Sequence, residues 1–206
     1  MTLRPLSRRD ALLSCVTWLL LGRGVRAEIT LKSWLLEFQM QEVIPTAPND
    51  QVSAMLKALE FDRNLGKHPG PIRIAVLFVQ GNAQSQGVKD QIMALLASAP
   101  TVVKRPVVPS EFAFTTPVEL ARIARTEMFT AFYLAPGMGD YVADVVHVSR
   151  DQKVLTVTGV PEYLKLGVSL TFLKYRDVIK VYLGETAASA EGSKFDADFI
   201  RRNKSL

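Results

Sequence analysis

Cysteine and histidine are almost absent from this chain of 206 residues, which contains one Cys and two His. The single cysteine, Cys15, lies near the N-terminus, so the rest of the chain can form no intramolecular disulfide and offers no thiolate as nucleophile or metal ligand. His68 and His147 stand far apart in sequence, and we expect each to be packed or to lie at the rim of the domain. Acidic residues near the C-terminus, among them Glu191, are scattered and are expected on a solvated face. No catalytic set can be argued from these residues, so the sequence predicts a protein that is not an enzyme and has no metal or cofactor.

Long apolar runs and a strong net charge are missing as well. No uncharged apolar segment reaches the roughly 18–20 residues that a membrane-spanning helix needs. The formal net charge is +5, but five of the 25 basic residues and one of the 20 acidic residues lie in the first 27 positions. The remainder is nearly neutral and has no electrostatic footprint for a phosphate backbone, so we expect no nucleic-acid partner. The overall composition, 48% hydrophobic and 22% charged, is typical of one globular domain.

Residues 1–27 have the order of an export signal. A basic start over residues 1–9 leads into an apolar run over 11–22, and small residues precede a possible cleavage after Ala27. Paired arginines in the basic start allow either the Sec or the twin-arginine route. We expect a cleaved bacterial signal peptide, hence a periplasmic protein without stable membrane insertion after cleavage. An uncleaved N-terminal anchor, a lipoprotein signal at Cys15 and a buried helix of the fold are the alternatives.

Residues 28–48 form an apolar N-terminal arm in front of a domain that we expect over 49–206. The arm carries several large apolar side chains, including Trp34 and Phe38, and ends in a segment with two prolines. Such an arm can cover the core of its own domain or can dock on a partner chain. A homodimer is one arrangement of the second kind.

Strand and helix patterns alternate through the rest of the chain. The expected strands cover 72–79, 101–108, 129–134 and 154–158, followed by a hairpin of 168–173 and 178–183. The expected helices cover 50–65, 84–98, 117–127, 140–149 and 161–165, with a last helical stretch from 187 or 195 to 200. Strands that are apolar on both faces and joined through helices belong to parallel sheets. The pattern therefore predicts an α/β fold with three layers, in which a mostly parallel, doubly wound sheet ends in a C-terminal antiparallel hairpin.

Three loops at the carboxyl ends of the expected strands are the candidate ligand site, because doubly wound folds bind ligands there. Each loop combines a glycine with polar side chains before a helix, although none matches a nucleotide-binding motif. In each case the alternative is an ordinary turn with a helix cap. The candidate contact residues are Gly81, Asn82, Gly137, Thr158, Gly159 and Glu162.

The order of several segments resembles the YfiR/HmsC-like family of exported bacterial proteins, over roughly residues 52–203. The block VLTVTGVPEY at 154–163 is the most specific part of this resemblance. A leading helix, a later strand and a C-terminal stretch of small residues before an aromatic residue support it, at 55–65, 178–183, 187–192 and Phe195.

The resemblance implies a non-catalytic periplasmic regulator. The better-known members restrain an inner-membrane diguanylate cyclase by binding its periplasmic sensor domain, which lowers cyclic di-GMP and biofilm formation. Such members often carry disulfide-forming cysteines, and this chain has none after residue 27, so redox control is not expected here.

Two functions therefore remain open. A regulator would contact its membrane partner through exposed apolar residues, either Trp34 and Phe38 in the arm or Tyr175 and Tyr182 in the hairpin. A periplasmic small-solute-binding protein would instead use the three glycine-bearing loops.

Overall fold

The structure is a computed structural model, and it describes residues 46–67, 70–99, 101–175 and 178–205. All of these belong to one compact unit, Ile44–Leu206, which is distinct from a first unit, Met1–Val43. The expected signal segment and the arm residues Trp34 and Phe38 lie outside the described residues.

Seven strands of the described part form one sheet, in the order β2-β1-β3-β4-β5-β6-β7. The strands from β2 to β5 pair in parallel, β5 and β6 form an antiparallel hairpin, and β7 pairs in parallel with β6. The predicted parallel α/β sheet with its C-terminal hairpin is thus confirmed. Their bounds are β1 (Ile72–Phe78), β2 (Val107–Ala113), β3 (Ala131–Leu134), β4 (Leu155–Thr158), β5 (Leu170–Tyr175), β6 (Val178–Leu183) and β7 (Lys204–Ser205).

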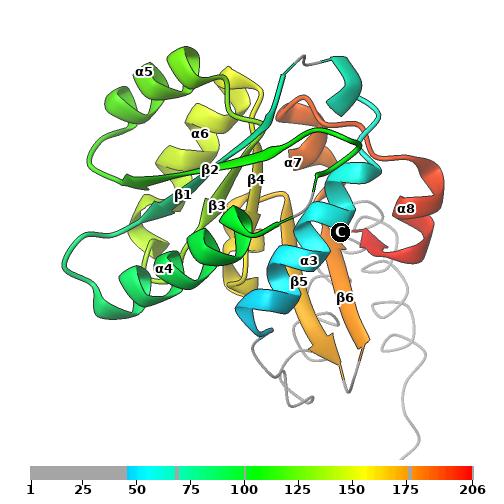
Figure 1. The fold of residues 1–206 in the computed structure, drawn as a ribbon, viewed down its shortest axis with the longest axis horizontal. Coiled ribbons are helices and arrows are strands. Elements are labelled where there is room, and N and C mark those ends of the chain that lie inside the picture. Colours follow the sequence, from blue (N-terminus) through cyan, green and yellow to red (C-terminus); the bar gives the residue numbers. More distant parts are fainter. Residues whose placement is uncertain (1–45, 68–69, 100, 176–177, 206) are drawn as a thin grey trace, which may run out of the picture. The chain divides into compact units, whose positions relative to one another are not determined.

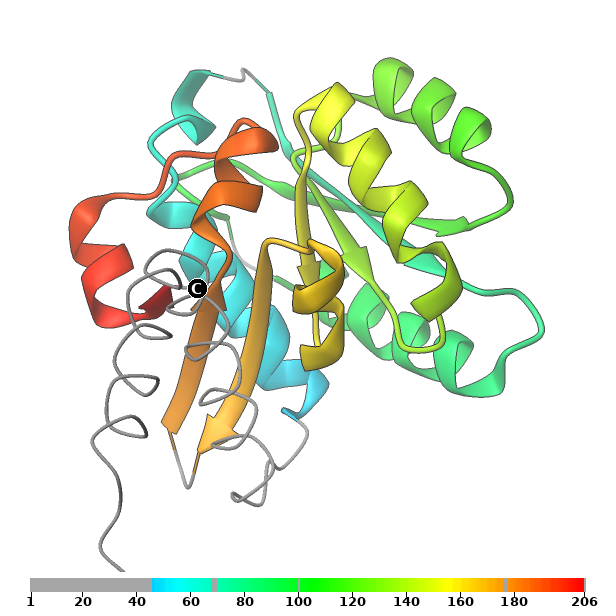
Figure 2. The ribbon, with the colours of Figure 1, turned by 180° about the vertical axis from the view of Figure 1, so that it is seen from behind.

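Helices cover both faces of this sheet and create two hydrophobic cores. Alternate residues of β1 divide between them, with Ile74 and Val76 in the first core and Ala75 and Leu77 in the second. Figure 1 shows α3 and α4 in front of the sheet, and Figure 2, from behind, shows α5 and α6 over the other face. The helices are α3 (Pro48–Glu60), α4 (Ala83–Ala97), α5 (Pro117–Glu127), α6 (Val142–Gln152), α7 (Glu185–Ala190) and α8 (Ala197–Arg202), with 3-10 turns η1 (Leu65–Lys67), η2 (Gly139–Tyr141) and η3 (Pro161–Leu166).

The helix expected over 50–65 starts earlier and ends earlier than predicted. Pro48 occupies the first turn of α3, where its missing N–H is not needed and its fixed φ suits the helix. Ala47 is the cap residue of α3. The last helical stretch is likewise resolved into two short helices, α7 and α8.

The strand expected over 101–108 is wrong, since β2 begins only at Val107. Val102 and Arg105 close a two-residue turn by two mutual backbone hydrogen bonds of 2.9 Å. The Arg105 guanidinium then donates to the carbonyls of Leu65 at 2.9 Å and Gly70 at 2.5 Å. Arg105 thus bonds the turn to the segment before β1, and β2 begins after this turn.

β2 is an edge strand within the described part, because it pairs only with β1. The Ile72 N–H donates to Pro106 O at 2.8 Å, and the Phe114 N–H donates to Phe78 O at 2.9 Å. In a parallel ladder the bonding direction alternates, so even-numbered amides along β2 point to β1 and odd-numbered positions point outward. Pro109 occupies an outward position, where its lack of an N–H costs no ladder hydrogen bond.

Glu191, just after α7, is buried, which corrects the expectation of a solvated face. Its carboxylate accepts hydrogen bonds from the Ser149 hydroxyl at 2.9 Å, the Thr156 hydroxyl at 2.6 Å and the Ser169 hydroxyl at 2.5 Å. The Thr156 N–H adds a fourth, at 2.8 Å. Burial raises the pKa of Glu191, and these four donors oppose that shift by favouring the charged form.

Candidate functional site

The topological switch point of the sheet lies between β1 and β3. After β1 the chain passes into α4, on the first core, whereas after β3 it passes into α6, on the second core. The two loops therefore diverge toward opposite faces of the sheet. In open α/β sheets this is where ligands bind. The predicted loops at residues 81–82 and 137 border it.

Asn82 and Gly137 lie in contact at this switch point. The Asn82 Oδ1 caps α4 by accepting the Ser85 N–H at 3.0 Å, which leaves the side-chain amide directed over Gly137. A Cβ at residue 137 would lie 2.6 Å from Asn82 Nδ2, so no other residue fits there without displacing that amide. Gly81 and Gly137 also have positive φ angles, of 82° and 83°, which glycine adopts readily.

Gly159, after β4, lies against the side chain of Gln51, a polar residue that the sequence did not indicate as part of the site. A Cβ at Gly159 would overlap the Gln51 carboxamide of α3. Gln51 Oε1 accepts a hydrogen bond of 2.5 Å from the Tyr133 hydroxyl, and Gln51 Nε2 donates to Thr46 O at 2.6 Å. Burial raises the pKa of the Tyr133 hydroxyl, so the hydroxyl remains a donor at neutral pH. The loop after β4 is thereby fixed to the start of α3.

Thr158 and Glu162 flank the turn that follows β4, and only Glu162 is exposed. Thr158 is buried, and its hydroxyl donates to Leu134 O at 2.9 Å and accepts the Val160 N–H at 3.0 Å. These bonds shape the turn between β4 and η3. Glu162 lies exposed in the first turn of η3.

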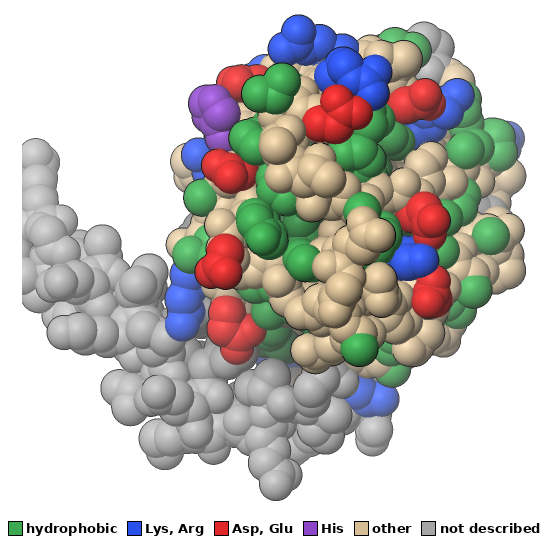
Figure 3. All heavy atoms as spheres, turned by 90° about the vertical axis from the view of Figure 1, so that its left-hand side faces the viewer, with side chains coloured by type: hydrophobic (Ala, Val, Ile, Leu, Met, Phe, Trp, Pro, Cys, Tyr) green, Lys and Arg blue, Asp and Glu red, His purple; other side chains and the backbone are tan. Residues whose placement is uncertain are grey.

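Aromatic side chains lie near the loop after β3, on the side of the second core. The Tyr163 hydroxyl accepts the Met138 N–H at 2.8 Å and so holds the loop after β3. Burial raises the pKa of Tyr163, against the opposing effect of the amides of this loop. The rings of Phe114 and Tyr141 have centroids 5.2 Å apart. Figure 3 looks onto this edge: apolar, uncharged polar and backbone atoms fill its middle, and acidic and basic side chains surround them.

The structure therefore brings together the loops at residues 81–82, 137 and 158–159 along one edge of the sheet. Adjacent strands lie about 4.8 Å apart, so these loops follow one another within a short distance. Sequence reasoning missed Gln51 and Tyr133, because an amide in a helix and a tyrosine in an apolar strand carry no sign of their pairing. The expected hairpin anchor Tyr182 is buried rather than exposed, and the side chain of Tyr175 lies outside what the structure describes.

Neither a metal centre nor a membrane span emerges from the described residues. No group of three or more His, Cys, Asp or Glu side chains gathers there. His147 is exposed, and its Nε2 lies 3.5 Å from Asp151 Oδ2. His68 is outside the described ranges. None of the helices described is both long and apolar enough to cross a bilayer.

No family model and no curated protein sequence matches the chain. A conserved domain protein from Vibrio cholerae O1 biovar El Tor shares the fold with a TM-score of 0.56 at 10% identity, covering 78% of this chain and 60% of that one. The ABC domain in complex with L-Trp from Streptococcus pneumoniae does so with a TM-score of 0.54 at 11% identity, covering 77% and 62%. At such identities the likeness shows the fold alone. The chain also spans only about three-fifths of the length of these two solved chains.

Proposed function

We propose that this protein is a non-catalytic binding protein that takes a small solute at the switch point between β1 and β3. The observation that carries the proposal is the placement of the Asn82 amide over Gly137, at the start of α4. This is the second of the two functions that the sequence left open.

The hydrogen-bond donors at this point define the solute. The first N–H groups of a helix have no partner inside the helix, and α4 presents those of Ala83 and Gln84 beside the Asn82 amide. A carboxylate or a carbonyl oxygen satisfies such donors, and the positive end of the helix dipole favours a negative charge. Tyr141 follows the loop with Gly137, is exposed and packs against the buried Phe114, and its ring offers an apolar surface to the rest of the solute.

One of the two structures that share the fold, the ABC domain from Streptococcus pneumoniae, was solved with L-Trp. A small molecule that combines a carboxylate with an apolar group therefore suits both the donors and the fold. The basic and apolar zones of residues 1–27 support a periplasmic location, where solutes of this class are captured.

An isosteric change at Asn82 tests the site. Asn82→Asp keeps the oxygen that caps α4 but replaces the amide donor with a negative charge. We expect carboxylate-bearing ligands, found by thermal shift with an amino-acid and organic-acid panel, to lose at least tenfold in affinity by calorimetry. Gln91→Glu is the matched control, because it adds the same charge at an exposed position in the middle of α4. Equal losses in both variants, or no ligand for the wild type, would contradict the proposal.

A regulator that binds a membrane partner is the second candidate, and one surface feature favours it. A groove of about 470 Å³ lies between α3, β6 and α8, with an apolar floor that includes Phe61, Ile179 and Phe199. Crosslinked membranes and a tagged protein test this function: capture of an inner-membrane cyclase through its periplasmic domain supports it. Ile179→Glu should then abolish capture while ligand binding at Asn82 persists.

A further inference from the structure

A second hollow lies at the opposite edge of the sheet, away from the loops described above. It has a volume of about 530 Å³ and opens where β1, β3 and β4 begin. Gly70 and Pro71 precede β1, Thr130 precedes β3, and Val154 precedes β4. Its size falls in the range of ordinary small-molecule pockets.

Four cationic side chains line this pocket, from four separate parts of the chain: Arg73, Arg105, Arg125 and Lys153. Asp62 is the only acidic residue among the described residues of the lining, and its Oδ1 already accepts the backbone N–H groups of Asn64 and Lys194, both at 2.9 Å. The pocket therefore has a positive excess even though the chain beyond residue 27 is nearly neutral.

These cations are not equally available to a ligand. Arg105 is engaged with backbone carbonyls, and the Lys153 ammonium donates to Ala190 O at 3.0 Å. Arg73 Nη1 pairs with Glu127 at 3.1 Å, and the other N–H groups of its guanidinium have no partner among the described residues. Arg125 is exposed and has no hydrogen-bond or ion-pair partner among the residues that the structure describes. Of the four cationic side chains, Arg73 and Arg125 are thus the two whose guanidinium groups can bind an anion.

The local backbone favours cations at this place without an acidic partner. Arg125 lies in the last turn of α5 and Lys153 directly follows α6, where the negative end of the helix dipole stabilises a positive charge. The helix ends themselves are partly capped, since the Met128 N–H donates to Ala124 O at 3.0 Å and the Val154 N–H to Ser149 O at 2.9 Å. An incoming anion therefore meets side-chain cations rather than a row of open carbonyls.

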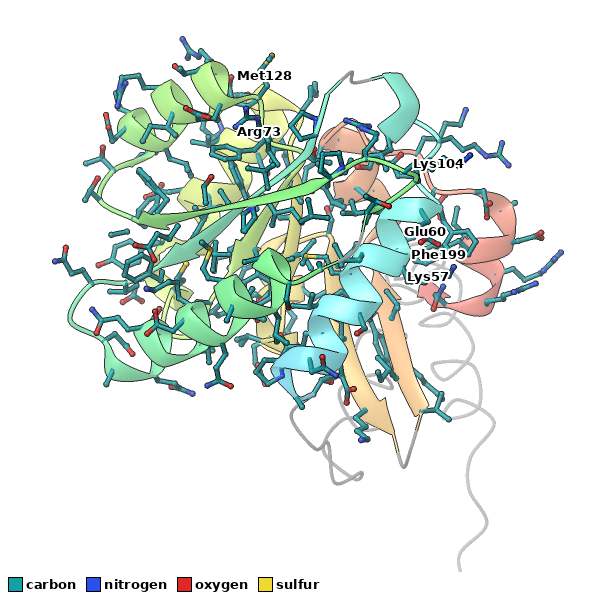
Figure 4. All side chains as sticks on the ribbon, viewed as in Figure 1. Lys57, Glu60, Arg73, Lys104, Met128 and Phe199 are labelled. Carbon is teal, nitrogen blue, oxygen red and sulfur yellow. The ribbon has the colours of Figure 1, made fainter. Side chains whose placement is uncertain are left out.

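The pocket also has an apolar side. Phe129 and Leu65 contribute buried surface, and Met128 stands at the rim with 76% of its surface exposed. Figure 4 shows Met128 and Arg73 near each other at the end of α5. A flexible thioether beside two guanidinium groups suits a molecule that is partly apolar and partly anionic.

We propose that this amino-edge pocket binds a small organic anion, whose carboxylate or phosphate group lies between Arg73 and Arg125 and whose apolar part lies against Met128 and Phe129. The planar guanidinium matches both anions by paired hydrogen bonds. This site is separate from the switch point, so Asn82→Asp leaves it intact.

Titration calorimetry with the full chain, in 150 mM NaCl, tests the pocket. The probes are phthalate and citrate as anions, with benzamide as an uncharged aromatic comparator. We expect phthalate or citrate to bind, and Arg125→Gln to weaken that binding at least tenfold. Arg122→Gln is the matched control, because Arg122 lies on the same helix, pairs with Glu119 and is not part of the pocket lining. We expect the affinity of the Arg122→Gln variant for phthalate or citrate to stay within about twofold of that of the wild type.

Three results would overturn the proposal. One is the absence of binding by both anions in the folded wild type, and another is an equal loss in Arg122→Gln, which would mean a general effect of surface charge. The third is binding of benzamide as tight as that of phthalate, which would show that the cations play no part. Thermal unfolding of each variant without probe establishes that it is folded.

Discussion

Val103 and Lys104 form a turn with φ angles of 49° and 60°, a conformation that disfavours a β-branched residue such as valine. Because both central residues have positive φ, Asn-Gly is the sequence that this turn prefers. We expect the double substitution Val103→Asn and Lys104→Gly to raise the free energy of unfolding by about 1 kcal/mol, measured by urea denaturation. Val118→Asn is the control, since Val118 is also exposed but lies in α5. An unchanged or lower stability of the double variant would count against a strained turn.

Two threonines on neighbouring strands should respond oppositely to valine. The Thr171 hydroxyl is buried and has no hydrogen-bond partner among the described residues, whereas the Thr156 hydroxyl donates to Glu191 and accepts the Ser169 N–H at 3.0 Å. Valine has nearly the same shape as threonine, so the substitution isolates the hydroxyl. We expect Thr171→Val to raise the unfolding free energy by about 1 kcal/mol and Thr156→Val to lower it by about 2 kcal/mol. Stabilities that change in the same direction would be inconsistent with this assignment.

At the scale of elements, long periodic segments were predictable and short irregular ones were not. The runs over 72–79 and 84–98 gave β1 and α4 nearly residue by residue, because apolar spacing alone fixes which face is buried. The strand predicted over 101–108 was wrong. The valines of this segment indicate a strand, and the turn at Val103 contains neither Gly nor Asn to indicate a turn. The position of Arg105 against two distant carbonyls decides that turn, and such a contact is not visible in local sequence.

The short helix α8 depends on a single aromatic stack. A helix of six residues is not stable alone, and Phe199 lies between Phe61 and Phe195, with ring centroids 5.2 and 5.0 Å away. We expect Phe199→Ala to cost about 3 kcal/mol and to release α8 together with β7. Figure 4 shows Phe199 directed toward α3.

Hydrogen exchange measures this release. Amides of α8 and β7 should lose protection in Phe199→Ala, while those of β1 and β3 keep theirs. Ile200→Ala, at a half-buried neighbour, should leave α8 protected. Uniform loss of protection across the sheet would mean that the stack supports the whole core.

At the scale of the whole molecule, Glu191 joins α6, β4 and the start of β5 through one buried carboxylate. Burial holds its pKa above the ordinary value of 4.5, so the native state binds the proton more tightly than the unfolded chain. Its contribution to stability is therefore fully present below about pH 4.5 and is lost as the pH rises through the raised pKa. We expect wild type to be favoured over Glu191→Gln more strongly at pH 4 than at pH 7, by denaturation at each pH.

Ser149→Ala keeps the carboxyl group of Glu191 and changes its pKa instead. It removes one donor to the charged carboxylate, so the pKa of Glu191 should rise further and stability should fall more steeply between pH 4 and 7. Parallel stability profiles for all three proteins would contradict the role given to Glu191.

The candidate site could be predicted only in part. The sequence predicts where its loops lie, but not which side chains from other elements pack against them. Parallel topology alone requires that the loops with Gly81 and Gly137 meet at one edge, and the structure places them there. The pairing of Gln51 with Gly159 depends on how α3 returns over the sheet, which no local pattern encodes. The cationic pocket at the amino edge likewise collects residues from four separate places in the chain.

Pro109 has a consequence for the protein in a crowded compartment. A parallel edge strand with all its outward amides is a template on which a second chain can add, and repeated addition leads to fibrils. Pro109 removes one outward donor from the middle of β2, so a visiting strand cannot form a continuous ladder there. Pro109→Val should leave the fold unchanged but shorten the lag time of aggregation at high concentration, as followed by thioflavin fluorescence. One ring in an edge strand thus interrupts the hydrogen-bond ladder that a second chain would need at the β2 edge of the sheet.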